Sequence, residues 1–330
     1  MTGTPARPDH PQVIVVGSFV QDHVWRIDRF VQAGETRRAL GFSTGPGGKG
    51  FNQVVACARQ GIATLFIGAI GEDALGANAQ RLARDERVEC RWLVRTDRST
   101  ATAGIVVDAA GANQIVVHLA ANDHLDPSFI EEQGDAFDAA KVLLLQMENN
   151  LDATVAALTL ATRHRLLRVL NPAPVHPGLD AALLARVDVL TPNETEFAQL
   201  LERVIGVATD ADTLARQSDE ELHRLARTLG VATVVITLGA NGSFVSHGEA
   251  DRRGDAEAFY RVEAEPANTL DTTGAGDAFS GALVAALLRF AGQPFRQAVE
   301  HAGRAAALST EKAGASTAMP HFDDVIARFS

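Results

Sequence analysis

The segment from Asp271 to Asp277 carries the residue types that phosphoryl transfer needs. It reads Asp-Thr-Thr-Gly-Ala-Gly-Asp and runs into a long apolar stretch, which predicts a glycine-rich turn that opens a helix. The first turn of a helix binds anions through unpaired N–H groups and the helix dipole. Gly274 and Gly276 would let a phosphate approach the backbone, and Asp277 could take a proton from a hydroxyl. An anion cradle and a base are the groups that phosphoryl transfer needs. A motif of this kind standing alone is more often a capped helix in which Asp277 only complements the dipole, so the rest of the chain must decide.

A second glycine cluster, Gly45–Asn52, reads Gly-Pro-Gly-Gly-Lys-Gly-Phe-Asn. A P-loop is excluded because Ser43 stands where its first glycine should be and Gly50 follows the lysine. The cluster matches the glycine spacing of a dinucleotide fingerprint, but no apolar strand precedes it, which argues against a dehydrogenase. Glycines here would let Lys49 and Asn52 contact a polyhydroxylated ligand, and a tight turn capping a helix is the alternative.

Two further segments follow predicted strands. In Thr191–Glu196, Asn193 and Glu196 are three residues apart in a first helical turn, so they share one face. A carboxamide and a carboxylate there suit a hydrated Mg²⁺, and an ordinary helix cap is the alternative. Thr237–Gly242 has the turn chemistry of a loop at the edge of a nucleotide site, or of a plain hairpin.

Two acids stand at the carboxyl ends of predicted strands. Asp22 follows the first strand, and Glu148 follows the apolar run 142–145. Because burying an unpaired carboxylate is costly, acids at this edge of an α/β sheet more often point at a ligand than into the core. We therefore expect Asp22 and Glu148 to contact the substrate.

Short apolar runs rich in β-branched residues alternate with longer helical patterns. This alternation predicts an α/β fold whose mostly parallel sheet is covered on both faces. The polar stretch Glu202–Glu220 predicts an irregular surface excursion. The predicted strands are Val13–Val16, Leu65–Ile70, Val142–Leu145, Leu166–Leu170, Val187–Leu190, Thr233–Thr237, Phe244–His247 and Phe259–Ala264, and the predicted helices are Asn52–Gln60, Gly76–Asp85, Leu151–His164, Glu194–Leu201, Glu220–Leu229, one opening near Asp277, and Phe295–Thr310.

Two regions interrupt this alternation. Trp25–Thr44 and Thr102–His118 look extended, and the second predicts a hairpin turning near Asp108–Asn113. Paired together they would form a small sheet, placed as a lid over the carboxyl edge of the main sheet. Two separate surface ribbons are the alternative.

The composition limits the classes of partner. The chain has 330 residues with a formal net charge of −11 and no basic run, which disfavours binding to nucleic acid or a membrane surface. Two cysteines cannot make a disulfide framework, and no apolar run reaches the length of about 18 residues that a membrane span needs. We expect a cytoplasmic protein whose polar residues 1–11 are disordered rather than a signal peptide.

Taken in order, these motifs resemble the ribokinase (PfkB-type) family of carbohydrate kinases over about residues 12–325. The resemblance implies a single ribokinase-like α/β domain with a β-sheet lid, formed by about residues 25–44 and 100–118, that often clasps the lid of a second subunit in a homodimer. It also implies transfer of the ATP γ-phosphoryl to a primary hydroxyl of a sugar. The matching segments are Gly45–Asn52, Gln146–Glu148, Asn171–Pro174, Thr191–Glu196, Thr237–Gly242 and Asp271–Phe279.

The resemblance assigns a role to each candidate residue. Asp277 is the implied base, and the backbone of Gly274, Ala275 and Gly276 the implied anion hole. Mg²⁺ and its waters fall to Asn193 and Glu196, and a monovalent cation such as K⁺ to Asp271 and Thr273 with carbonyls of 307–318. The implied sugar ligands are Asp22, Gly47, Gly48, Lys49, Asn52 and Glu148, and the implied nucleotide contacts are Asn193, Thr237, Gly239, Gly242 and Gly276.

One position departs from the family pattern. Ribokinases usually carry a sugar-contacting Asn two residues before the acid that Asp22 matches, and this chain has Val20. Valine cannot bond a hydroxyl, so 2-deoxyribose, a fructose-type sugar or a nucleoside is an alternative to ribose. A nucleoside would need an aromatic ring to stack on its base, for which Phe19, Trp25 and Phe42 are the candidates.

Overall fold

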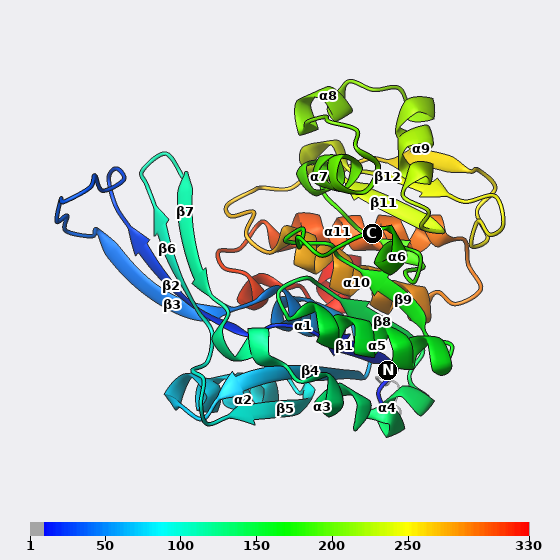
Figure 1. Ribbon diagram of the computed structural model, residues 1–330. Helices are drawn as coiled ribbons and strands as arrows, with labels where there is room; N and C mark the ends of the chain where they lie inside the picture. Colours follow the sequence, from blue (N-terminus) through cyan, green and yellow to red (C-terminus); the bar gives the residue numbers. More distant parts are fainter. Residues whose placement is uncertain (1–9, 330) are drawn as a thin grey trace.

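The computed structural model describes residues 10–329, and its centre is a nine-stranded sheet with the order β13-β12-β11-β10-β9-β8-β1-β4-β5 (Figure 1). The strands from β11 to β5 run parallel, and β12 and β13 complete one edge in antiparallel fashion. The strands are β1 (Val13–Val16), β4 (Thr64–Gly71), β5 (Glu89–Arg95), β8 (Val142–Leu145), β9 (Leu167–Leu170), β10 (Val189–Leu190), β11 (Thr233–Thr237), β12 (Ser243–His247) and β13 (Phe259–Val262).

Helices cover both faces of this sheet, which is why its central strands are apolar on both sides. Successive residues of β1 alternate between two cores: Ile14 and Val16 pack under α3 to α9, whereas Val13 and Val15 pack under α1, α2 and α10 to α12. The first group comprises α3 (Pro127–Glu131), α4 (Gly134–Ala139), α5 (Leu151–Arg163), α6 (Ala181–Leu184), α7 (Glu194–Ile205), α8 (Ala211–Ala215) and α9 (Asp219–Thr228), and the second α1 (Lys49–Arg59), α2 (Ala74–Asp85), α10 (Ala275–Arg289), α11 (Phe295–Ser309) and α12 (Phe322–Phe329).

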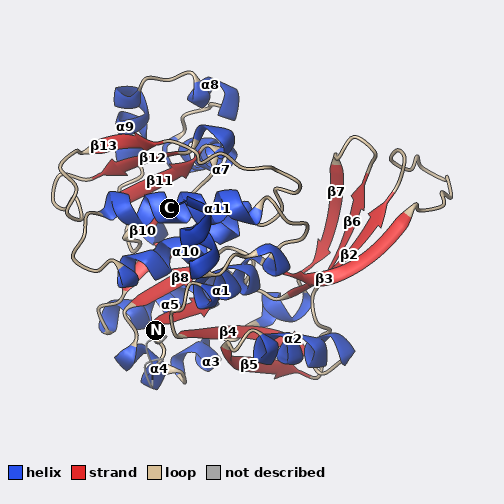
Figure 2. Ribbon diagram, turned by 180° about the vertical axis from the view of Figure 1, so that it is seen from behind, coloured by secondary structure: helices blue, strands red, loops and turns tan. Residues whose placement is uncertain are grey.

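A separate four-stranded sheet, the small sheet, extends away from the main body (Figures 1 and 2). Its order is β3-β2-β6-β7, with β2 and β6 parallel and the outer pairs antiparallel. Because β1 leads into β2 and β3 leads into α1, the small sheet starts at the carboxyl edge of the main sheet. Its strands are β2 (Val20–Arg26), β3 (Gly41–Gly47), β6 (Thr102–Val107) and β7 (Asn113–His118).

The structure confirms the α/β alternation and the pairing of the two extended regions, and corrects several boundaries. The edge strand β5 was not predicted, because its sequence Glu-Cys-Arg-Trp-Leu-Val-Arg mixes charged and apolar residues. The predicted irregular stretch Glu202–Glu220 contains α8 and the ends of its neighbours. In the small sheet, β2 begins at Val20 rather than Trp25, and residues 27–40 are a loop. Residues 1–9 of the expected disordered segment lie outside the described part. No helix within residues 10–329 has the length and apolarity to cross a membrane.

Helices α1 and α10 approach closely at a glycine. A Cβ built on Gly281 of α10 would lie 2.5 Å from the backbone oxygen of Gln53 and 2.6 Å from the Cβ of Ala56, both in α1. Nothing but hydrogen fits between the two helices here, so the glycine sets their separation. The contact matters because α10 begins within the Asp277 motif and α1 begins within the second glycine cluster.

We therefore expect Gly281→Ala to destabilise the fold by about 1–3 kcal/mol, the usual effect of overpacking a filled interface. Urea unfolding would measure the change. Gly134→Ala in α4 is the matched control, because a Cβ there meets nothing within 4 Å and alanine suits a helix better than glycine. Equal stability of both variants and the original chain would contradict the tight contact.

Candidate active site

The first turn of α10 presents the predicted anion-binding backbone. Gly274 caps the helix with φ 78°, a left-handed conformation that glycine adopts readily. A Cβ on Gly274 would lie 3.1 Å from Cα of Ala315, whereas a Cβ on Gly276 would meet nothing within 4 Å. The side of this turn at Gly276 is therefore open to a ligand, as an N-terminal anion site requires.

The carboxylate of Asp277 is 5% exposed and is held by two amides of α1. Asn52 Nδ2 donates to Oδ2 at 2.8 Å, and Gln53 Nε2 donates to Oδ1 at 2.9 Å. Each carboxylate oxygen thus receives one neutral donor and keeps lone-pair capacity for a further proton donor. The structure therefore brings Asp277 and Asn52, predicted from motifs far apart in the sequence, into direct contact.

Four of the predicted sugar ligands surround the start of α1. Glu148 Oε2 accepts hydrogen bonds from the backbone N–H of Lys49 at 2.8 Å and from Ser18 Oγ at 2.6 Å. A Cβ on Gly47 would lie 2.2 Å from Asp22 Oδ2, so the glycine makes room for that carboxylate. Burial, and secondly the charge of Glu148, raise the pKa of Asp22 to about 7. Asp22, Gly47, Lys49 and Glu148 form one polar group.

Lys49 supplies positive charge between the acids. Burial lowers the pKa of its amine, but the nearby carboxylates of Asp277, Glu148 and Glu196 outweigh this effect and raise it. The ammonium group is therefore retained at neutral pH. A fixed cation here can attract an anionic group that enters between these carboxylates.

Two cavities meet at the start of α10. The smaller, about 150 Å³, is lined by Lys49, Glu196 and Asp277 among others. The larger, about 730 Å³, lies beside it and is lined mostly by small residues. Both cavities are lined by Asn193, Thr237, Thr272, Ala275 and Gly276.

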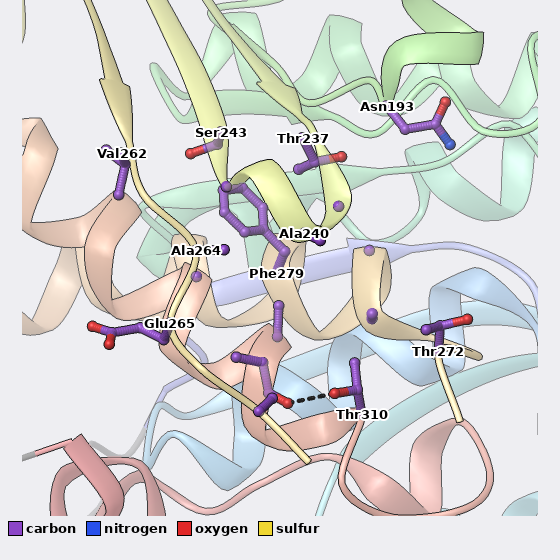
Figure 3. A pocket seen from close by; sticks show the side chains of 18 of the residues that line it. Asn193, Thr237, Ala240, Ser243, Val262, Ala264, Glu265, Thr272, Phe279 and Thr310 are labelled. Carbon is purple, nitrogen blue, oxygen red and sulfur yellow. Dashed lines mark hydrogen bonds between the residues drawn. The ribbon is translucent and has the colours of Figure 1, made fainter. Parts of the chain in front are cut away.

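The larger cavity contains the predicted nucleotide contacts Thr237, Gly239 and Gly242. Gly242 has φ 81°, and a Cβ there would lie 2.0 Å from the backbone oxygen of Val262, so the β11–β12 turn depends on glycine. Phe279, from α10, projects among Thr237, Ser243 and Ala264 (Figure 3). An apolar floor with a few polar groups is typical of a site for a flat ring system.

Asn193 and Glu196 form a capping box at the start of α7. Asn193 Oδ1 accepts from the backbone N–H of Glu196 at 2.8 Å, and Glu196 Oε2 accepts from the backbone N–H of Asn193 at 2.9 Å. Both residues also line the smaller cavity. No group of three or more His, Cys, Asp or Glu residues in the described chain could hold a metal ion directly. A carboxamide and a carboxylate are the oxygen ligands that suit a Mg²⁺ ion that keeps its waters.

Asp271 joins the loop before α10 to the loop after α11. Its Oδ1 accepts from the backbone N–H of Thr273 and its Oδ2 from that of Gly314, both at 2.9 Å. The carbonyl of Thr310 accepts from the backbone N–H groups of Leu270 and Asp271. Burial raises the pKa of the Asp271 carboxyl, but its hydrogen bonds from Gly314 and Thr273 outweigh burial and hold the pKa below its usual value. The structure thus places Asp271 and Thr273 beside residues 310–314, within the expected range.

Sequence reasoning missed the side chains that hold the site residues in place. Ser18 bonds Glu148, Gln53 bonds Asp277, and Gln146 and Asn171 bond Gln53. Gln146 and Asn171 lie within matched segments and Gln53 directly follows one, but their role was not expected. Only the fold shows that these three residues and Ser18 are buried around the site.

The structure also locates the residues that bear on substrate choice. Val20 is 3% exposed and packs with Ala101, Ala103 and Ala120. Phe19 is fully buried against Phe51, with ring centroids 5.1 Å apart, so the expectation that it could stack on a base is wrong.

The chain is similar to known carbohydrate kinases over nearly its whole described length. The family model of the pfkB family carbohydrate kinases matches residues 10–321. The ribokinase of Haemophilus influenzae is 34% identical over 93% of this chain and 94% of its own. The ribokinase structure from Giardia lamblia has a TM-score of 0.85 at 25% identity over 97% of this chain and 99% of its own. The ribokinase structure from Arabidopsis thaliana, complexed with ribose and ATP, has a TM-score of 0.80 at 28% identity. The match covers 97% of this chain and 100% of the Arabidopsis chain.

The fold and the site define a phosphotransferase of the α/β class. The family match covers nearly the whole of the described chain. The chain belongs to the pfkB family of carbohydrate kinases.

The raised pKa of Asp22 predicts a specific pH dependence of stability. The pKa is about 7 in the folded chain and about 3.9 when unfolded, so between these values the folded state holds the extra proton. Stability therefore decreases as pH rises from about 4 to 7. We expect Asp22→Asn to remove this decrease, measured by urea unfolding from pH 5 to 8. Parallel stability curves for the two proteins would contradict the raised pKa.

Proposed function

We propose that the chain is an ATP-dependent ribokinase that converts D-ribose into D-ribose 5-phosphate. One observation carries this proposal: Asp277 stands at the helix N-terminus where the two cavities meet, bonded by Asn52 of the sugar-side motif. The larger cavity would take ATP, and the region between Asp22, Lys49 and Glu148 would take the sugar. The relatives reported above are named ribokinases, and one of them was solved with ribose and ATP, which supports ribose as the sugar.

The reaction divides among the residues as follows. Asp277 takes the proton of the sugar's primary hydroxyl as its oxygen attacks the γ-phosphorus. The bond between that phosphorus and the β–γ bridging oxygen breaks, and ADP leaves. The backbone N–H groups of Gly274, Ala275 and Gly276 stabilise the transferring phosphoryl group, which is mainly positioned and neutralised rather than chemically activated.

The sugar hydroxyls would be held by polar groups already fixed in place. Asn52 Oδ1 is buried without a hydrogen-bond partner among the described residues, so it is ready to accept from a hydroxyl. Asp22 and Glu148 offer further acceptors and Lys49 offers a donor. Gly47 and Gly48, also assigned to the sugar site, let the Asp22 carboxylate and the backbone of residues 18–20 approach closely.

We assign Mg²⁺ to Asn193 and Glu196 through water, where it would neutralise charge on the ATP phosphates. We assign K⁺ to Asp271 and Thr273 with nearby backbone carbonyls. The support for Mg²⁺ is that Asn193 and Glu196 line the cavity that contains Asp277. The support for K⁺ is the contact between Asp271 and Gly314.

We infer that the small sheet acts as a lid and pairs with that of a second copy in a homodimer. Its exposed apolar residues Trp25, Phe42, Ile115, Val116 and Val117 support pairing, because exposed apolar patches mark interaction sites. Sedimentation of a monomer at all concentrations tested would contradict the dimer.

We treat residues 12–325 as one kinase domain, which the extent of the family match supports. We also place the enzyme in the cytoplasm, where reduced cysteines persist. Recovery of the protein outside the cytoplasmic fraction of its own cells would contradict that location.

A nucleoside kinase or a fructokinase-type enzyme is the second candidate. Val20 brings no polar group to the sugar, whereas Trp25 and Phe42 are exposed on the small sheet with ring centroids 5.2 Å apart. Such rings could stack on a nucleoside base.

ADP release with ATP, Mg²⁺ and K⁺ tests the proposal on D-ribose, 2-deoxyribose, fructose, adenosine and inosine. We expect turnover to be highest with D-ribose and to fall when Mg²⁺ or K⁺ is omitted. Asp277→Asn should lower kcat by roughly 10²–10⁴, the usual contribution of a positioned base.

Asp180→Asn is the matched control, because asparagine can replace this helix cap, which lines neither cavity. Turnover of nucleosides alone would favour the second candidate. Folded protein that turns over none of the substrates would contradict the kinase assignment.

A further inference from the structure

Gln53 is fully buried and uses its whole amide group in hydrogen bonds. Its Nε2 donates to Asp277 Oδ1 at 2.9 Å and to Asn171 Oδ1 at 3.2 Å, while its Oε1 accepts from Gln146 Nε2 at 2.5 Å. We propose that Gln53 is a positioning residue that sets the direction of the Asp277 carboxylate for proton transfer. This inference rests on the proposed function, in which Asp277 is the base.

The network ends at two groups, the Thr191 carbonyl and the Asp277 carboxylate, and these decide which atom donates in each hydrogen bond between them. The Thr191 carbonyl can only accept, so Asn171 must donate through Nδ2, at 2.8 Å, and accept through Oδ1. The ionised carboxylate of Asp277 can also only accept. Gln53 must therefore turn its Nε2 toward both, and Gln146 supports this orientation by donating to its oxygen. A flipped amide would oppose its Oε1 to the carboxylate.

The network is anchored to three neighbouring strands. Gln146, Asn171 and Thr191 directly follow β8, β9 and β10, which are consecutive in the sheet. The space for Gln146 depends on a glycine, because a Cβ on Gly17 would lie 2.3 Å from its Oε1. The orientation of Asp277 is thus tied to the rigid edge of the sheet, as precise catalytic geometry requires.

Without Gln53, only Asn52 would restrain the carboxylate, and Asn52 is also proposed to contact the sugar. A displacement of about 1 Å in a reacting group can lower the rate by about 10²-fold. We expect Gln53→Met, which keeps length but loses both donors, to lower kcat by roughly 10- to 100-fold. KM for ribose and for ATP should change by less than about threefold, because the lost interaction does not hold either substrate.

The test is a double-mutant cycle with Asp277→Asn, read as ADP release with D-ribose. If Gln53 acts through Asp277, adding Gln53→Met to Asp277→Asn should lower kcat by less than about twofold, because coupled residues are not additive. Gln60→Met is the matched control: Gln60 is buried at the end of the same helix and bonds Pro320 and His301. We expect it to leave kcat within about twofold of the original chain, as for a site outside the network.

An isosteric variant gives a second, independent readout. Gln53→Glu places a carboxyl group against Asp277, so the acid limb of the kcat–pH profile should move to higher pH. Lys49 and Glu196 also face Asp277 but are the same in both proteins, so the shift reports residue 53.

Three results would overturn the inference. Gln53→Met could slow the Asp277→Asn enzyme as much as the original one, or change KM with kcat intact. If that variant fails to fold, an unshifted profile for Gln53→Glu overturns it. The ribokinase proposal fails separately, if the original chain does not turn over D-ribose. The cycle is then read with whichever substrate is turned over, and the inference fails with the kinase assignment if there is none.

Discussion

The close contact between α1 and α10 is the constraint on which the site depends. Gly281 lets the two helices touch, and this brings Asn52 and Gln53 of one against Asp277 of the other. The sugar-side motif and the phosphate-side motif are more than two hundred residues apart in the chain. Their helices share one packed face against the sheet, so the site is a consequence of core packing rather than of loops alone.

Charge at the site is balanced locally. Lys49 faces three carboxylates, and Asp22 is kept partly protonated at neutral pH by burial and by Glu148. The direct hydrogen-bond donors to the Asp277 carboxylate are the neutral amides of Asn52 and Gln53. The N-terminal backbone N–H groups of α10 carry partial positive charge at the place where an anionic phosphoryl group would arrive. An enzyme with an acidic surface can bind a polyanion in this way because the attraction is local.

Most of the fold was predictable because the buried parallel strands are continuous apolar runs with clear boundaries. The strand β5 was not, since this edge strand interrupts its apolar residues with Glu89, Arg91 and Arg95. The motif residues Asp277, Asn52, Asn193 and Gly242 were found because glycine, amide and acid types at fixed spacings imply chemistry. The role of the amides that orient Asp277 could not be found this way. Gln146 and Asn171 stand in recognised segments, but only the sheet order places them side by side around Gln53. The burial of Phe19 was likewise invisible in the sequence and depends on Phe51 and Trp92.

A crystal structure of the chain with D-ribose and a non-hydrolysable ATP analogue tests the central claim most directly. The account predicts the primary hydroxyl of ribose within about 3 Å of the Asp277 carboxylate, the hydrogen-bond reach of a general base. It also predicts the terminal phosphate against the N–H groups of Gly274 to Gly276, with Gln53 still bonded to Asp277. A sugar whose primary hydroxyl points away from Asp277, or a nucleotide whose phosphates lie elsewhere, would contradict it.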